Sequence, residues 1–288
     1  MKKILITGAN SYIGVSFENY MKQWADEYSV DTVDMIDGTW REKDFGGYDA
    51  VFQVAGIAHK KETKENFELY YKVNRDLAIE TAKKAKKDGV KQFIFLSSMS
   101  VYGMDTGVIT NDTVPMPKSN YGKSKLQAEE GITSLRSDNF KVAVLRPPMV
   151  YGEGCKGNYN TLAKIALNIP AFPKINNRRS MLYIENLCEF VRLIVNSQGC
   201  GVFCPQNAEY VNTTQMANLI CQANKKKFHS IRIMNCIISI AEKTLPSFRK
   251  AFGSLTYDMN MSVYQGRYNV VSFEDSIIRT ELNSIKLK

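Results

Sequence analysis

The sequence predicts an α/β fold, with a doubly wound parallel sheet covered by helices on both faces and a smaller C-terminal region. Three observations carry this prediction. The chain has 288 residues with 44% hydrophobic and 23% charged content, which is ordinary for a globular protein. It opens with a short apolar run, a glycine-bearing turn and a helix-period segment. Short apolar runs then alternate with helical segments, a pattern that builds parallel sheets.

Strand and helix patterns alternate through the first half of the chain. Apolar residues with helical spacing, such as Ile13 and Phe17, follow the first strand, and Pro147-Pro148 end the last one. We expect strands at 3–7, Val30–Val33, Ala50–Val54, Gln92–Leu96 and Lys141–Leu145, and helices at Tyr12–Trp24, Phe67–Lys87 and Tyr121–Leu135.

Beyond Gly152 the pattern is less regular, because glycines and prolines punctuate short segments. A helix is expected at Ile184–Val195, and another at Ser230–Lys243 that is apolar almost all round, as in a buried or interface helix. We therefore assign residues 1–152 to the sheet domain, with 183–208 returning to it. Residues 153–182 and 209–288 then form the second, ligand-covering region.

Several classes of protein are disfavoured. The apolar run after Lys2-Lys3 breaks at Gly8, so no secretory peptide is expected, and no apolar run reaches the ~20 residues of a membrane span. The six cysteines lack the spacing of a zinc site, so we expect no metal and reduced thiols in the cytoplasm.

The net charge of +9 is compatible with nucleic acid, an anionic membrane surface or an anionic small molecule. Much of the charge lies in two lysine clusters, at 83–87 and 225–227, where a solvated helix face and a loop are the simplest interpretations. No aromatic residues are interleaved with these clusters to stack on bases. We therefore discount nucleic acid and retain an anionic small molecule.

The stretch from Thr7 to Gly14 (TGANSYIG) has the context of a dinucleotide-binding turn, since it follows a strand and opens a helix. Gly8 permits the tight turn and Gly14 the close packing of helix on strand, while free amides at the helix start hold the pyrophosphate. Ser11 replaces the usual middle glycine. Either the backbone approaches the phosphate past this small side chain, or the serine hydroxyl contacts a phosphate itself.

Two acids follow the second strand. Asp34 stands where a carboxylate accepts the adenosine ribose hydroxyls and repels an extra phosphate, which favours NAD over NADP. Asp37 competes for this role or lies nearer the adenine. Either acid could also be an ordinary turn or capping residue, and NADP stays possible.

Hydroxyl, phenol and ammonium groups follow in an order typical of hydride-transfer enzymes. Ser97-Ser98 end the strand at 92–96, and Tyr121 and Lys125 lie four apart on one helix face. A nearby ammonium is expected to lower the pKa of Tyr121, so that the phenol takes or returns a hydroxyl proton while hydride moves to nicotinamide. Ser98 would hydrogen-bond the same oxygen, and Lys125 would also anchor the nicotinamide ribose.

Over about residues 1–260 the chain resembles the extended short-chain dehydrogenase/reductase family, in its NAD-dependent epimerase/dehydratase branch, which has a Rossmann-like sheet. The matching stretches are the Thr7–Gly14 turn, Ala55-Gly56-Ile57-Ala58-His59, Val73-Asn74, Ser97-Ser98, Val101-Tyr102-Gly103, Tyr121–Lys125 and Arg146-Pro147-Pro148. The resemblance implies a catalytic triad of Ser98, Tyr121 and Lys125. The expected cofactor-binding residues are Gly8, Asn10, Ser11, Tyr12, Ile13, Gly14, Asp34, Asp37, Ala55, Gly56, Asn74, Tyr121, Lys125 and Pro148.

The resemblance also implies a nucleotide-sugar substrate, UDP-linked by expectation, and a homodimer built from the helices near 75–88 and 121–135. Arg179 resembles the arginine that pairs with a nucleotide-sugar diphosphate, a task that suits a bidentate guanidinium. Arg249 is a second such candidate, and for both arginines an ordinary surface cation is the alternative. The expected substrate-binding residues are Ser98, Ser100, Asn158, Arg179 and Arg249.

The residues next to Ser98 limit which reactions of the family fit this sequence. Family dehydratases carry an Asp-Glu pair where this chain has Met99 and Ser100, so dehydration is disfavoured. Two activities remain. One is an NAD-dependent nucleotide-sugar 4-epimerase of the UDP-glucose 4-epimerase kind. The other is an NAD(P)H-dependent 4-keto nucleotide-sugar reductase of surface-polysaccharide synthesis. Met149 replaces the asparagine of familiar epimerases, but Asp34 favours bound NAD and places epimerisation first. A non-catalytic dinucleotide-binding protein is the third alternative.

Overall fold

The protein is built around a six-stranded parallel sheet. The computed structural model describes residues 1–58, 62–63, 66–232 and 252–286. Its main sheet has the strand order β10-β6-β4-β3-β1-β2, and every neighbouring pair is parallel. The strands are β1 (Lys2–Thr7), β2 (Tyr28–Val33), β3 (Ala50–Gln53), β4 (Gln92–Leu96), β6 (Lys141–Leu145) and β10 (Gly201–Phe203). The predicted fold class is therefore confirmed.

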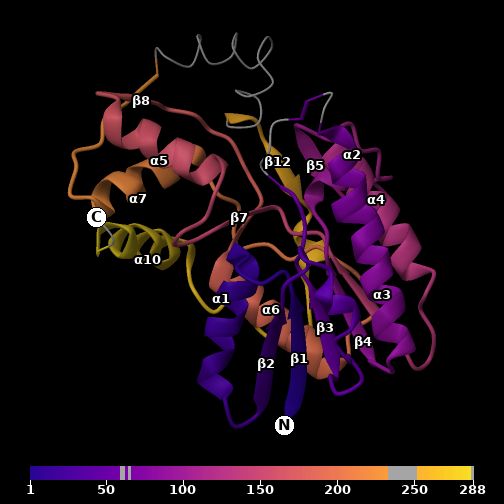
Figure 1. The fold of residues 1–288 in the computed structure, drawn as a ribbon. Coiled ribbons are helices and arrows are strands. Elements are labelled where there is room, and N and C mark those ends of the chain that lie inside the picture. The colour runs from indigo at the N-terminus through magenta and orange to yellow at the C-terminus, as the bar shows by residue number, and fades with distance from the viewer. Residues whose placement is uncertain (59–61, 64–65, 233–251, 287–288) are drawn as a thin grey trace.

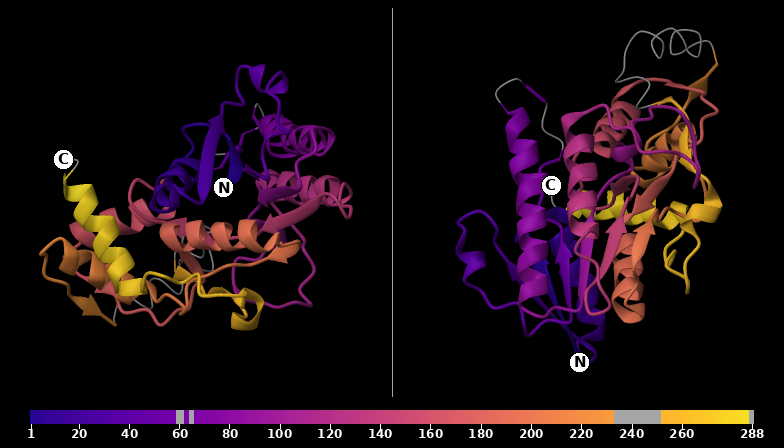
Figure 2. Two further views of the ribbon diagram at one scale, coloured as in Figure 1. Left: turned by 90° about the horizontal axis from the view of Figure 1, so that it is seen from below. Right: turned by 90° about the vertical axis from the view of Figure 1, so that its right-hand side faces the viewer.

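Helices cover both faces of this sheet (Figures 1 and 2). Alternate residues of β1 show the two layers, because Ile4 and Ile6 belong to one core cluster and Leu5 belongs to the other. The first core is closed by α1 (Tyr12–Met21) and α6 (Ile184–Ser197). The second is closed by α3 (Leu77–Lys87) and α4 (Asn120–Thr133).

The long helical segment predicted at 67–87 is helical throughout but not uniform. A single turn, α2 (Phe67–Tyr70), leads into a π-helix at Tyr71–Asp76 and then into α3. Wide π-turns occur frequently at functional sites. Short 3₁₀ turns lie at Lys22–Trp24, Thr39–Arg41, Met99–Tyr102 and Met259–Ser262.

Smaller elements gather beyond the carboxyl edge of the sheet, in the upper part of Figure 1. The helices are α5 (Asn158–Asn168), α7 (Thr213–Ala223) and α10 (Phe273–Lys286). Three two-stranded parallel pairs join distant segments: β5 (Gly107–Ile109) with β12 (Leu255–Tyr257), β7 (Met149–Tyr151) with β9 (Met181–Tyr183), and β8 (Phe172–Pro173) with β11 (Ser230–Ile231).

The helix predicted at Ser230–Lys243 does not begin where we expected. Ser230 and Ile231 form β11 and pair with β8, so a contact with a distant segment overrides the local apolar pattern. Residues 233–243 of this prediction lie outside the described residues. In the described part of the chain no helix has the length and apolar character needed to cross a bilayer. The five described cysteines form no disulfide.

A tight turn directly after the 3₁₀ turn Met99–Tyr102 gives a test of this fold. Gly103 has φ +65°, and a Cβ there would lie 2.0 Å from the carbonyl oxygen of Met116. Gly89 has φ +87° but open space around it. We expect Gly89→Ala to cost about 1–2 kcal/mol of unfolding free energy from backbone strain alone. Gly103→Ala should cost about 1–3 kcal/mol more, because the backbone of the Met116 loop must move.

Urea unfolding of both variants measures this difference. Equal losses of stability in the two variants would show that Gly103 tolerates a side chain and that the contact with Met116 is not a constraint.

Candidate active site

The glycine turn after β1 leaves no room for side chains. Gly8 has φ +95°, and a Cβ there would lie 2.9 Å from the Cα of Ala55. A Cβ on Gly14 would lie 2.6 Å from the Oγ of Ser11. The Ser11 hydroxyl caps α1 by accepting the Gly14 N–H at 3.2 Å. Ser11 thus has a structural task at the helix start.

The turn also fixes the position of the two acids. The N–H groups of Gly8 and Ala9 donate to the Val33 carbonyl at 2.9 and 3.2 Å, which places Asp34 directly beside the turn. The Asp34 carboxylate accepts the Ile36 N–H at 2.7 Å. Asp37 is exposed and turned toward Thr39, whose hydroxyl and N–H lower the pKa of its carboxyl. Of the two acids, Asp34 is the one that adjoins the glycine turn.

The predicted catalytic side chains line one cavity of about 520 Å³ at the carboxyl edge of the sheet. Ser98 follows β4, and its Oγ accepts the Ser100 N–H at 3.1 Å and lies 3.0 Å from the Ser100 Oγ. Tyr121 is in the first turn of α4, which Ser119 caps at its start. Lys125 is one turn further, with its Nζ donating to the Leu96 carbonyl at 2.8 Å.

The electrostatics of this trio differ from our expectation. Burial raises the pKa of Tyr121 above its usual value, although a hydrogen bond with Ser98 opposes the rise. Burial lowers the pKa of Lys125 to about 8, while the Glu129 carboxylate acts in the opposite direction. The predicted lowering of the Tyr121 pKa by Lys125 is therefore absent in this arrangement. The Lys125 ammonium is engaged by a backbone carbonyl of β4, and Tyr121 is a neutral phenol.

Asn74 supports the site through hydrogen bonds to neighbouring elements. Its side chain accepts the Ile57 N–H at 2.7 Å and donates to the Ile57 carbonyl at 3.1 Å and to the Ser124 hydroxyl at 3.3 Å. A Cβ on Gly56 would lie 3.0 Å from the Asn74 Oδ1 and 3.3 Å from the Lys125 Nζ. Asn74, presented by the π-helix, therefore fastens the loop after β3 to α4. It is absent from the lining of the cavity itself, and so is Ala55.

The same cavity extends to the expected substrate residues. Ser100, Asn158 and Arg179 contribute to its walls, as do Ser11, Tyr12, Ile13, Gly56 and Pro148 from the expected cofactor set. Gly8, Asn10, Gly14, Asp34 and Asp37 lie outside this lining, although Gly8 and Gly14 shape the turn that borders it. Arg249 lies outside the described residues.

Arg179 is the most informative of the substrate candidates. Its Nη1 donates to the Gly253 carbonyl at 2.9 Å, and burial lowers the pKa of its guanidinium. None of the ion pairs formed within the described residues involves Arg179. A half-buried cation facing a cavity without a carboxylate partner favours an anionic ligand.

Sequence reasoning missed a buried polar cluster behind the catalytic residues. Glu129, one turn after Lys125, pairs with Arg146 at 2.5 Å and accepts a hydrogen bond from Ser97, the neighbour of Ser98. Arg146 also donates to the Tyr102 hydroxyl at 2.9 Å. The sequence did contain a signal for this cluster. Glu129 lies four residues after Lys125 on the same face of the helix, and an acid on that face requires a buried partner.

The lining contains further residues that the sequence patterns did not single out. Asp105 and Lys156 add one charge of each sign, and Met104 and Cys155 add apolar surface. They come from irregular segments, where periodicity carries no information about which side chains meet.

The site has features that fit a nicotinamide dinucleotide. Gly8 and Gly14 let the turn pack closely on Ala55 and Ser11, and the start of α1 opens on the cavity through Ser11, Tyr12 and Ile13. The Tyr12 hydroxyl is buried and has no hydrogen-bond partner within the described residues. These observations support the cofactor predicted from the glycine motif.

Comparisons with known proteins place the chain in a family. The family model described as the NAD dependent epimerase/dehydratase family matches residues 4–203, and the chain belongs to that family. It is 28% identical to a UDP-glucose 4-epimerase of Vibrio cholerae, over 78% of this chain and 76% of that protein. It is also 28% identical to the N-acetyl-alpha-D-glucosaminyl-diphospho-ditrans,octacis-undecaprenol 4-epimerase of Escherichia coli O157:H7, over 80% of this chain and 75% of that protein.

Solved structures share the fold. A UDP-glucuronic acid 4-epimerase from Bacillus cereus in complex with NAD superposes with a TM-score of 0.75 at 18% identity, covering 99% of each chain. A dTDP-4-dehydrorhamnose reductase from Clostridium acetobutylicum gives 0.74 at 18% identity, with the same coverage. The chain is thus an NAD(P)-dependent enzyme of the epimerase/reductase kind.

The Glu129 cluster yields a prediction about pH. Glu129 raises the pKa of Lys125, so Glu129→Gln should lower that pKa and Lys125 should lose its proton at a lower pH. If protonated Lys125 is required, the alkaline limb of the kcat/KM profile shifts to lower pH. The variant should also lose roughly 3–5 kcal/mol of stability, because the buried Arg146 is left unpaired.

The matched control is Glu130→Gln at the exposed neighbouring position. A Glu129→Gln enzyme that folds and keeps the pH profile of the control would show that Glu129 does not tune the charge of Lys125.

Proposed function

We propose that the protein is an NAD-dependent nucleotide-sugar 4-epimerase that acts on a UDP-linked hexose. The observation that carries this proposal is the single cavity that joins Ser98, Tyr121 and Lys125 to the half-buried Arg179. One end of the cavity offers proton transfer, and Arg179 offers a partner for phosphate oxygens. A sugar carried on a diphosphate has both of the groups that such a cavity would contact.

The chemistry follows from the positions of the side chains. The glycine turn and the start of α1 would hold a nicotinamide dinucleotide, which would supply the hydride acceptor and, after the 4-keto sugar has turned, the hydride donor. We assign to Ser98 a hydrogen bond with the oxygen on sugar carbon 4, and to Tyr121 the removal and later return of the hydroxyl proton, because both side chains line the cavity. Since the pKa of Tyr121 is raised by burial, removal of the proton requires a nearby positive charge. In the structure without ligands the Lys125 ammonium donates to the Leu96 carbonyl and does not act on Tyr121, so we assign it to that task only once cofactor and substrate are bound.

The preference for NAD rests on Asp34. Its carboxylate directly follows β2, and the strand end is tied to the glycine turn by the Gly8 and Ala9 amides. A carboxylate there suits two ribose hydroxyls and repels a 2′-phosphate. The related structures contain NAD or NADP, so both dinucleotides fit the family.

The choice of a diphosphate sugar is supported by the relatives. The two proteins at 28% identity are named for a UDP-sugar and for a sugar on undecaprenyl diphosphate. Both named substrates carry a sugar on a diphosphate, the group we assign to Arg179. We favour a UDP-linked sugar as the substrate. A sugar linked to a lipid diphosphate is the alternative substrate, and assays with a panel of both kinds of sugar distinguish the two.

Reduction of a 4-keto nucleotide sugar is the second candidate. It would use the same three catalytic residues, and a reductase of this kind shares the fold at a TM-score of 0.74. A non-catalytic dinucleotide-binding protein is a weaker alternative, since such a protein has no need for Ser98, Tyr121 and Lys125 in one cavity.

We also propose a cytoplasmic homodimer assembled through α3 and α4. The two helices pack side by side on one face of the sheet and could present a joint surface to a second copy. Analytical ultracentrifugation tests this proposal, and a monomer at micromolar concentration would contradict it.

The role of Tyr121 is tested by removing its hydroxyl. Tyr121→Phe should lower kcat for UDP-hexose interconversion roughly 100-fold or more, because the acid–base group is lost. Tyr71→Phe is a suitable control, since its hydroxyl contacts Asn120 at the start of α4 and is absent from the cavity lining. A Tyr121→Phe enzyme with the activity of the control would remove Tyr121 from the mechanism.

The role of Arg179 is tested against its neighbour. Arg179→Met should raise KM for the nucleotide sugar about 10-fold or more, because a charge-assisted contact with phosphate is lost, and should leave NAD binding unchanged. The control is Arg178→Met, which removes an exposed guanidinium next to it. Equal KM values for the two variants, measured by steady-state kinetics, would show that Arg179 does not meet the diphosphate.

A further inference from the structure

Positive charge is concentrated in two stretches of the second region. Residues 158–178 and 210–232 together contain no Asp or Glu. They contain seven Lys or Arg residues, namely Lys164, Lys174, Arg178, Lys225, Lys226, Lys227 and Arg232. The chain as a whole has 38 basic and 29 acidic residues, so this local imbalance far exceeds the average.

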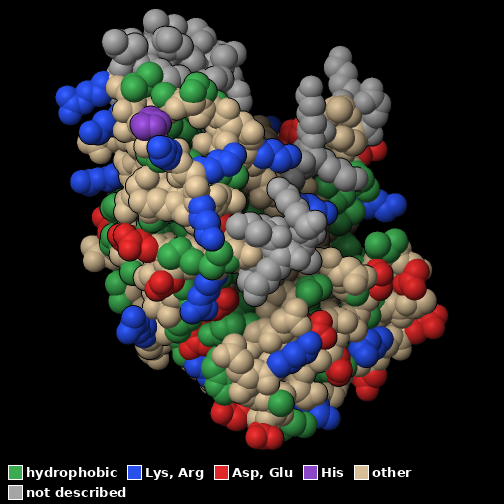
Figure 3. Space-filling model, turned by 90° about the vertical axis from the view of Figure 1, so that its left-hand side faces the viewer, with side chains coloured by type: hydrophobic (Ala, Val, Ile, Leu, Met, Phe, Trp, Pro, Cys, Tyr) green, Lys and Arg blue, Asp and Glu red, His purple; other side chains and the backbone are tan. Residues whose placement is uncertain are grey.

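The fold brings the two stretches together. They form α5, β8, α7 and β11, which share a small core that includes Phe172, Ala217 and Cys221. All seven cationic side chains are exposed. Figure 3 shows Lys and Arg gathered on the upper part of this side of the molecule, while Asp and Glu lie mostly lower. We call the seven residues the basic surface.

Acids of α10, the helix that packs against α7, lie near these stretches. Glu281 of α10 is buried, where it accepts hydrogen bonds from Tyr159 at 2.7 Å and Asn224 at 2.8 Å. Glu274 and Asp275 lie in the first turn of α10, and Ser272 holds the Asp275 carboxylate at 2.7 Å. Within the two stretches themselves there are seven cations and no acid, so these stretches carry net positive charge.

The lysine-rich helix α3 offers a contrast. Lys84 pairs with Asp88 at 2.7 Å, and Lys86 donates to the Leu135 carbonyl at 2.6 Å. Glu80 lies on the same helix and pairs with Arg41. The charges of α3 are mixed with acids, and this cluster serves as an internal comparison.

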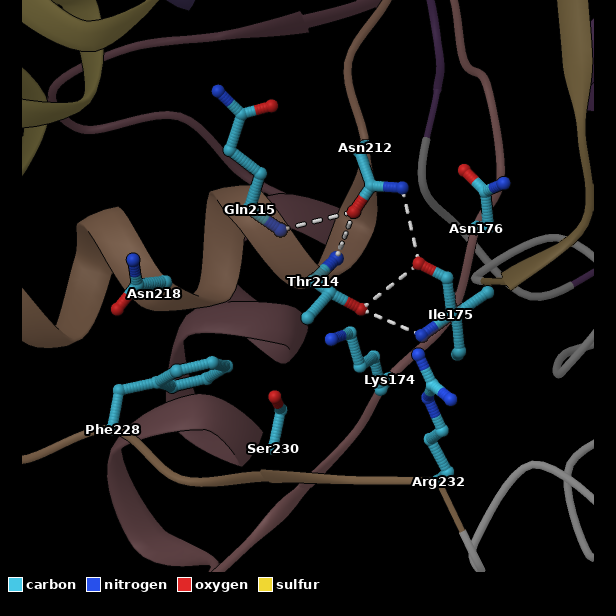
Figure 4. Close-up of a pocket in the computed structure, with 10 residues that line it drawn as sticks. All are labelled: Lys174, Ile175, Asn176, Asn212, Thr214, Gln215, Asn218, Phe228, Ser230 and Arg232. Atoms are coloured by element: carbon cyan, nitrogen blue, oxygen red, sulfur yellow. Dashed lines mark hydrogen bonds between the residues drawn. The ribbon is translucent and has the colours of Figure 1, made fainter.

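A second cavity, of about 640 Å³, opens within the basic surface. Figure 4 shows Lys174 and Arg232 near one another, from the residues that directly follow the paired strands β8 and β11. The described wall also contains the side-chain amides of Asn176, Gln215 and Asn218 and the ring of Phe228. Cations beside amide donors suit phosphate and glycerol oxygens.

Apolar side chains accompany these charges. Ile231 is 42% exposed and Ile165 is 37% exposed, and Phe228 is half-buried at the cavity. A surface that combines lysines with exposed aliphatic groups suits the headgroup layer of a membrane. Nucleic acid would favour a series of stacking rings, and among the described residues of the cavity wall Phe228 alone is aromatic.

From this arrangement we propose that the basic surface docks the protein on anionic phospholipid headgroups, with the cavity between Lys174 and Arg232 receiving a headgroup phosphate. The proposal does not depend on the reaction catalysed at Ser98 and Tyr121. Docking of this kind is peripheral and reversible, and salt weakens it because exposed charges are screened.

The test is co-sedimentation of the full chain with vesicles. We expect binding to phosphatidylglycerol/phosphatidylcholine vesicles at low salt, loss of binding as salt is raised, and little binding to phosphatidylcholine alone. Lys225→Gln combined with Lys227→Gln should weaken binding about 30-fold, at ~1 kcal/mol for each lysine near the surface. Lys174→Gln combined with Arg232→Gln tests the cavity in the same way.

The matched control removes two exposed charges elsewhere, as Lys83→Gln with Lys87→Gln on α3. It should bind as the unaltered protein does, and thermal unfolding shows whether each variant is folded. If a variant fails to fold, the salt dependence and lipid preference of binding by the unaltered protein decide whether the proposal holds. Absence of binding to anionic vesicles, equal loss in the α3 control, or tighter binding to duplex DNA than to vesicles would each overturn the proposal.

Discussion

The buried pair between Glu129 and Arg146 is the constraint on which the active site depends. It joins α4, which carries Tyr121 and Lys125, to the loop after β6, which carries Pro147 and Pro148 into the cavity. The second partner of Glu129 is Ser97, so the end of β4 is fixed by the same carboxylate. Ion pairs this deep are costly to bury, and their satisfied hydrogen bonds are what make them tolerable.

A second constraint acts between backbones. The loop after β3 passes so close to Gly8 that Ala55 would contact any side chain there. Asn74 then ties the same loop to Ser124 of α4. The glycine turn, the loop after β3 and α4 are therefore fixed relative to one another, and these rigid elements bound the cavity. The second region adds Arg179, whose position depends on the Gly253 carbonyl and on backbone pairing with Val211 and Leu255.

Much of the first half was predictable from sequence, because parallel strands between helices leave a strong apolar period. The strands at 92–96 and 141–145 match the prediction, and α4 begins at Asn120 where Tyr121 was expected. The carboxyl edge of a parallel sheet also predicts that Ser98 and Tyr121 meet. Ser230 and Ile231 show the limit, since pairing with β8 decides their conformation and no local pattern encodes a partner some sixty residues away. The raised pKa of Tyr121 was equally hidden, because burial is a property of the packed site.

The central claim is that the cavity performs a reversible oxidation with retained NAD. The most direct measurement identifies by mass the dinucleotide released from purified protein, and then follows UDP-glucose and its 4-epimer without added cofactor. Our account predicts bound NAD and interconversion of the two sugars with no net change in NADH absorbance. An empty protein that consumes NADH or NADPH only with a 4-keto sugar would contradict it and would establish reduction instead.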